Sequence, residues 1–151
     1  MRASDKAKSG IDFYDAGNNS FDKQISSDQH DKICLWLYKK LKTDKAFFMS
    51  AMDFVPDIVF EKVDFRLESP ILRGDRIIGF CDVEVRLWFK DDRDNLYSRS
   101  FLIEVKSKVN VGETIRQIRY YGGEHWYVCA PMFDDVDVLK EQGIRFIPYE
   151  P

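Results

Sequence analysis

Three charged side chains near the middle of the chain have the types and spacing that metal-assisted hydrolysis requires. Asp82 lies in the run GFCDVEV, and Glu104 and Lys106 stand two positions apart in FLIEVK. Side chains two positions apart on a strand share a face, so Glu104 and Lys106 are expected side by side, with Asp82 beside them if the two strands pair. Two carboxylates can ligate a hard cation such as Mg²⁺, and an amine can stabilise the charge that develops as a phosphodiester bond breaks.

Each of these residues has a defined role in that chemistry. Asp82 and Glu104 would ligate the cation, and the carbonyl oxygen of Val105 is a further candidate ligand. Lys106 would orient the attacking water, stabilise the pentavalent transition state or act as a base. The sequence does not choose between these three roles of Lys106.

A helix is predicted directly after this strand, over GETIRQIRYY, and it carries groups suited to a phosphate substrate. At about 100° per residue the polar side chains fall on one face and the apolar ones roughly opposite. The polar face holds Glu113, Arg116, Gln117 and Tyr120, and the apolar face holds Val111, Ile115 and Ile118. We expect Gln117 near the metal-bound waters and Arg116 or Arg119 as a phosphate clamp. The same residue types are also typical of a solvated helix face.

The overall charge requires any nucleic-acid contact to use a local patch. The net charge is -3 and the isoelectric point is near 5.4, so the chain has no general basic surface. Between residues 97 and 121, however, five Lys or Arg stand against two Glu. The candidate substrate-binding residues in this patch are Lys108, Arg116, Arg119 and Tyr120.

The surrounding pattern predicts the elements that would position these residues. Ser26 and Gln29 form a capping box ahead of a helical apolar spacing that reaches Leu41, and residues 46–60 are apolar without a decisive period. Period-two runs on either side of Gly74-Asp75 predict a hairpin, and a third strand follows the polar turn at 90–97. A helix ending near residues 122–123, a buried strand, a helix and a last strand follow. The expected fold is therefore α/β, a mixed sheet flanked by helices.

These residues and this order resemble the PD-(D/E)XK nuclease superfamily, to which restriction endonucleases and Holliday junction resolvases belong. The resemblance covers about residues 27–130 and rests on an Asp in a hairpin strand, EVK in the next strand and a helix bearing Gln. It implies an αβββαβ restriction-endonuclease-like core, here with a C-terminal helix-strand extension. It also implies metal ligands at Asp82 and Glu104, a catalytic Lys106, and Gln117 near the site. Cys81 stands where the motif that names the superfamily has Pro.

The resemblance further implies a cofactor and a substrate. The cofactor would be Mg²⁺, with Mn²⁺ as a substitute, and the reaction would be hydrolysis of DNA, with RNA not excluded. A further acid is expected to complete the metal site, and the candidates are Asp28, Asp31, Glu61 and Glu68. Glu68 is favoured because ESPI directly precedes the hairpin turn and is expected across from Asp82.

The histidines and cysteines predict no zinc site. His30 is assigned to a capping region and His125 to a turn, with no second His or Cys at ligand spacing. Cys34, Cys81 and Cys129 stand among apolar neighbours, which is typical of reduced core thiols.

The remaining expectations concern organisation and partners. Residues 1–24 are expected to form a loosely packed arm, and residues 25–151 a single domain. The absence of a signal-like or membrane-spanning apolar run predicts a cytoplasmic protein. A homodimer is expected if both strands of a duplex are cut, since one compact site cuts one strand. The rival interpretation is a catalytically inactive nucleic-acid-binding or assembly module on the same fold.

Overall fold

The computed structural model describes residues 20–53 and 59–151, the residues 20–27 by their backbone alone. Helix α2 runs over Ser20–Thr43 and passes through Ser26 without interruption. The capping box predicted at Ser26 is therefore wrong as a helix start, because the chain is already helical there. Most of the predicted N-terminal arm, residues 1–19, lies outside the described residues, and residues 20–24 belong to α2.

The stretch that the sequence left undecided begins with a second helix. Helix α3 covers Lys45–Ala51, and the side chain of its N-cap Asp44 accepts a hydrogen bond from the backbone N–H of Phe47 at 3.0 Å. This bond satisfies one of the donors that a helix start leaves unpaired. Within the described ranges 20–53 and 59–151, no helix is long and apolar enough to cross a membrane.

A five-stranded mixed sheet forms the centre of the molecule. Its order is β1 (Lys62–Arg73), β2 (Arg76–Lys90), β3 (Leu96–Val105), β4 (Trp126–Ala130) and β5 (Arg145–Pro148). The first three strands pair antiparallel, and β4 and β5 add in parallel. The predicted hairpin is confirmed, with Gly74 at φ +64° in its turn, a conformation that glycine adopts without strain. Helix α4 (Val111–Tyr121) connects β3 to β4, and α5 (Val136–Glu141) connects β4 to β5.

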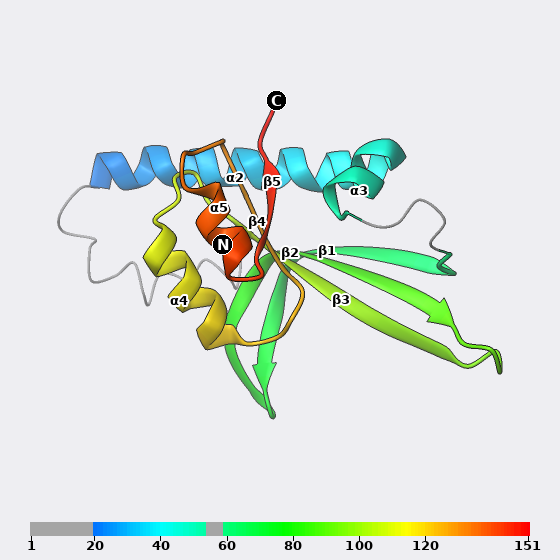
Figure 1. The fold of residues 1–151 in the computed structure, drawn as a ribbon. Helices are drawn as coiled ribbons and strands as arrows, with labels where there is room; N and C mark the ends of the chain where they lie inside the picture. The colour runs from blue at the N-terminus through cyan, green and yellow to red at the C-terminus, as the bar shows by residue number, and fades with distance from the viewer. Residues whose placement is uncertain (1–19, 54–58) are drawn as a thin grey trace.

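Helices cover both faces of the sheet, as the sequence predicts (Figure 1). The alternation along β4 shows the two layers: Tyr127 and Cys129 pack in a cluster with α2 and α3, while Trp126 and Val128 pack in a cluster with α4 and α5. The first cluster also holds Ile103 of β3. All five residues of WYVCA are buried. Because this strand is covered on both faces, its sequence is a continuous apolar run and does not alternate.

The sheet is bent where the candidate site lies. Glu68 adopts φ +55° in the middle of β1, and the end of the β1–β2 hairpin turns away from β3 (Figure 1). The predicted alternation along β2 fails at this bend. Cys81 joins the cluster beside α4 and α5, whereas Val83 and Val85 join the cluster beside α2 and α3. A residue in the left-handed region, opposed to the middle of β2, is the kind of irregularity that re-aims side chains next to it.

Candidate functional site

Asp82 and Glu104 stand where the pairing of β2 with β3 ends. Val83 lies opposite Ile103 in the antiparallel register, and Asp82 and Glu104 are the next residues on the two strands. Both side chains are deeply buried, each 2% exposed. The carboxylate of Asp82 reaches across to β3, where its Oδ2 accepts a hydrogen bond from the backbone N–H of Val105 at 2.8 Å.

Gln117 of α4 joins Glu104 to Lys106. Its side-chain nitrogen donates to Oε2 of Glu104 at 2.9 Å, and its Oε1 accepts from Nζ of Lys106 at 2.7 Å. Lys106 Nζ also lies 3.6 Å from Glu104 Oε2. The structure therefore brings together three of the predicted residues on one side of the sheet.

The local sequence explains how α4 places Gln117 there. Asn110 caps the helix, its side chain accepting from the backbone N–H of Glu113 at 3.1 Å, so the helix begins a few residues after β3 ends. Thr114 and Ile118 are buried against the sheet. Gln117 follows Thr114 by three residues, which places it next to that buried side, and it is half-buried.

The other predicted residues of α4 lie on its exposed surface. Glu113, Arg116 and Tyr120 are exposed, and so is Lys108 in the segment before the helix. Arg119 hydrogen-bonds the side chain of Gln142, just after α5, so it is part of a contact between α4 and the C-terminal segment.

Tyr120 is tied to the hairpin. The guanidinium of Arg73, at the end of β1, lies 4.8 Å from the centre of the Tyr120 ring and also donates to the Tyr120 carbonyl oxygen. An arginine on an aromatic ring makes a favourable cation–π contact. This contact joins the bent hairpin to the C-terminal turn of α4.

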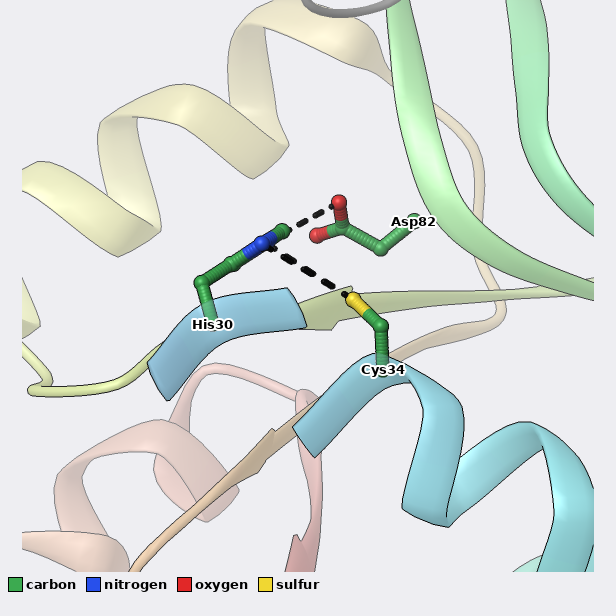
Figure 2. Close-up of side chains that lie close together, drawn as sticks. All are labelled: His30, Cys34 and Asp82. Carbon is green, nitrogen blue, oxygen red and sulfur yellow. Dashed lines mark hydrogen bonds and ion pairs between the residues drawn. The ribbon is translucent and has the colours of Figure 1, made fainter. Parts of the chain in front are cut away.

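A second cluster of polar groups lies on the α2 side of Asp82 (Figure 2). His30 Nε2 is 3.1 Å from Asp82 Oδ1, and Cys34 Sγ is 3.8 Å from the same imidazole nitrogen. One ligand atom from each of the three residues lies within 4.8 Å of the other two, so this group could bind a metal ion. His30 is in the interior of α2, not in a capping region, and Cys34 follows it by one helical turn. The premise that no Cys stands at ligand spacing from His30 overlooked the four-residue spacing in HDKIC.

The acids proposed as further ligands occupy different places. Glu68 is half-buried and, from the pairing of its neighbours, lies across from Asp82, as predicted. Asp31 approaches His30, with Oδ1 3.4 Å from Nδ1. Asp28 is exposed on α2, and Glu61 is exposed at the start of β1, near Trp88 at the far end of β2.

A third buried acid, Glu84, belongs to a hydrogen-bonded network of its own. It accepts hydrogen bonds from the hydroxyls of Ser69 and Ser100, each at 2.6 Å, and from Arg86 at 3.1 Å. Burial alone would raise the pKa of Glu84, but the bonds from Ser100 and Ser69 and the charge of Arg86 outweigh it and lower the pKa. The ion pair of Glu84 with Arg86 is therefore formed on a buried carboxylate.

The other two cysteines are core thiols, as predicted. Cys81 and Cys129 are buried, and none of the three cysteines forms a disulfide. Burial raises the pKa of both thiols well above the usual value, and nearby acids add to the effect. They are therefore protonated near neutral pH and unreactive.

Comparison of the chain with protein-family models, with curated proteins and with solved structures finds no match.

Proposed function

We propose that the protein is a Mg²⁺-dependent nuclease that hydrolyses phosphodiester bonds in DNA on a restriction-endonuclease-like core. The observation that carries this proposal is the continuous contact from Lys106 through Gln117 to Glu104, with Asp82 bonded to the neighbouring Val105 N–H. These residues come from two strands and a helix. A surface that merely alternates apolar and charged residues has no reason to gather them in one buried place.

The buried acids fit a hard divalent cation. Asp82 and Glu104 are each 2% exposed and are the residues next to the last β2–β3 pair, where two carboxylates lose hydration. An ionised carboxylate has about four acceptor positions. The contacts of Val105 and His30 with Asp82, and those of Gln117 and Lys106 with Glu104, use about two positions on each carboxylate. When bound, Mg²⁺ would polarise the phosphoryl group and lower the pKa of a water molecule that attacks it.

Lys106 and Gln117 would orient the reacting groups. An ammonium has three N–H donors, and the contacts of Lys106 with Gln117 and Glu104 leave at least one for a phosphoryl oxygen or the attacking water. Gln117 holds this ammonium in place through Oε1 and holds Glu104 through its nitrogen. A charged donor fixed in advance stabilises developing negative charge without reorganisation during the reaction.

The exposed residues beside this cluster would bind the nucleic-acid backbone. Lys108 and Arg116 present positive charge, and Tyr120 is 54% exposed although Arg73 lies over its ring. Backbone contacts of this kind depend on charge and not on sequence, so we expect binding that weakens with salt. The same contacts would accept RNA, and a homodimer would let two such sites cut a duplex.

A cleavage assay tests the proposal. Single-stranded, duplex and branched DNA and a matched RNA are incubated with the protein in Mg²⁺, in Mn²⁺ and in chelator. We expect metal-dependent cutting that falls by at least about 100-fold in Asp82→Asn, Glu104→Gln and Lys106→Ala. The matched controls are Asp92→Asn and Lys90→Ala, both exposed near the distant β2–β3 turn.

Circular dichroism of each variant checks that the fold survives. A protein that binds DNA equally with and without metal and never cuts it is a binding module, and the nuclease proposal then fails. Equal activity in Glu104→Gln and in the controls would also contradict it.

A further inference from the structure

We propose that His30, Cys34 and Asp82 form a second metal site, selective for Zn²⁺ or a similar thiophilic divalent cation, that shares Asp82 with the Mg²⁺-dependent site. The existence of this site does not depend on the nuclease proposal, whereas the sharing of Asp82 between two cations does. Figure 2 shows the imidazole, the thiol and the carboxylate converging from α2 and β2.

The spacing of the three ligand atoms suits a tetrahedral ion. Zn–N and Zn–O bonds near 2.1 Å and a Zn–S bond near 2.3 Å place ligand atoms about 3.3 to 3.6 Å apart. The imidazole nitrogen Nε2 lies 3.1 Å from Asp82 Oδ1 and 3.8 Å from Cys34 Sγ, so both separations are within a few tenths of an ångström of that range. The sulfur and the carboxylate oxygen are within 4.8 Å. Cys34 Sγ also lies 3.9 Å from Nδ1, so it does not yet lie along the lone pair of Nε2. A turn of the imidazole that points Nε2 between the sulfur and Asp82 Oδ1 would complete three corners of a tetrahedron, and water can take the fourth.

The surroundings orient the imidazole for such a role. His30 and Cys34 are four residues apart on α2 and so lie on one helix face. The second ring nitrogen of His30, Nδ1, is 3.4 Å from a carboxylate oxygen of Asp31. A histidine that binds a metal through one nitrogen usually donates a hydrogen bond from the other to a carboxylate or carbonyl, and this contact leaves Nε2 for the ion.

The ligand types decide which cation this site takes. A thiolate with an imidazole favours a borderline or soft ion, whereas Mg²⁺ prefers oxygen ligands and keeps its waters. Zn²⁺ would bind the Cys34 thiolate, and the thiol proton would be released to solvent. Occupation would engage Asp82 Oδ1 on the α2 side, and the proposed nuclease would then lack one of its two carboxylates. Zn²⁺ is therefore expected to inhibit Mg²⁺-dependent cleavage.

Cobalt spectroscopy of the full chain tests the site directly. The metal-free protein, kept reduced, is titrated with Co²⁺, whose bound form reports a thiolate ligand through a charge-transfer band and tetrahedral geometry through intense visible bands. We expect one Co²⁺ per chain, displaced by Zn²⁺, and a rise in thermal unfolding temperature with either metal. His30→Gln and Cys34→Ser should each weaken affinity at least about 100-fold, because even residues that only orient a metal ligand contribute 10 to 100-fold.

The chain supplies matched controls. His125→Gln removes the other described histidine and Cys129→Ala removes a second buried thiol, and both should bind Co²⁺ as the unaltered chain does. Half-exposed His30 tolerates substitution better than Cys34 in the core, so His30→Gln decides the matter if Cys34→Ser unfolds. Absence of the thiolate band, or unchanged affinity in His30→Gln, overturns the proposal. Co²⁺ binding without any DNA cleavage would support this site while the nuclease proposal fails, and cleavage without a thiolate band would do the reverse.

Discussion

The buried carboxylate of Glu84 offers a test of the fold that needs no knowledge of activity. We predict that Glu84→Gln lowers the free energy of unfolding at pH 7 by about 2 to 4 kcal/mol. The substitution keeps the shape of the side chain and removes its charge. Its surroundings are fixed: the side chain is 4% exposed and is held by two hydroxyls and one guanidinium.

The magnitude follows from how the amide would fit among these donors. Oε2 accepts from both Ser100 and Arg86, whereas Oε1 accepts from Ser69 alone. The Gln oxygen would therefore take the Oε2 position, and its NH₂ would face Ser69, whose hydroxyl can rotate to accept. All three contacts survive as neutral-acceptor bonds, each weaker by about 1 kcal/mol than a bond to a carboxylate. Their sum gives the predicted loss.

The pH dependence separates this cause from a packing defect. Because the pKa of folded Glu84 lies below its usual 4.5, its contribution is fully present above that value and is lost as pH falls through the folded pKa. Urea unfolding of both chains at pH 7 and below pH 4 measures it, with exposed Glu141→Gln as the control. The difference between Glu84→Gln and the unaltered chain should shrink in acid. A loss under about 0.5 kcal/mol at pH 7, or an equal loss at both pH values, would refute the reasoning.

Two further substitutions test contacts around the site. In Gly79→Ala the new Cβ would stand 2.5 to 2.9 Å from two ring carbons and the hydroxyl oxygen of Tyr121, whose ring stacks on Trp126. The free energy of unfolding, measured with urea, should therefore fall by about 1 to 3 kcal/mol. The control is Gly112→Ala, whose nearest neighbour would be 3.7 Å away and which should lose no stability. In Tyr127→Phe the buried hydroxyl that donates to the Met52 carbonyl at 2.7 Å is lost, which should cost about 1 to 2 kcal/mol; an unchanged urea midpoint would show that water replaces this bond.

Short sequence patterns predicted most helices and strands, because a turn or a helix end depends on a few adjacent residues. The turn at Gly74-Asp75 and the helix end at Gly122 depend on backbone conformations that glycine favours, and both appear where predicted. The convergence of Glu104, Lys106 and Gln117 was also accessible, because a two-residue strand period and a short connection to the next helix fix it. The start of α2 was not accessible in this way. Ser26 has the right partner for a cap, but the helix runs through it.

The α2 side of the site was missed for a different reason. The contact of His30 with Asp82 joins residues 52 positions apart in the chain. Neither hydrophobic periodicity nor turn residues predict a contact between positions so far apart. The i, i+4 pair formed by His30 and Cys34 was visible in the sequence, but its partner carboxylate depends on how the helix crosses the sheet. The break in alternation at Cys81 was likewise unpredictable, because its companion is the left-handed conformation of Glu68 on the neighbouring strand.

The bend lies beside two buried carboxylates that contact different layers of the molecule. Helices α2 and α4 pack against opposite faces of the sheet, so side chains on them are ordinarily separated by its thickness. At the bend β2 leaves β3, and Asp82 can bond the β3 backbone through one oxygen and His30 of α2 through the other. On the neighbouring strand, Glu104 bonds Gln117 of α4. At the end of the β2–β3 pairing, an amide and an ammonium therefore approach Glu104 from one layer, and an imidazole with its neighbouring thiol approaches Asp82 from the other.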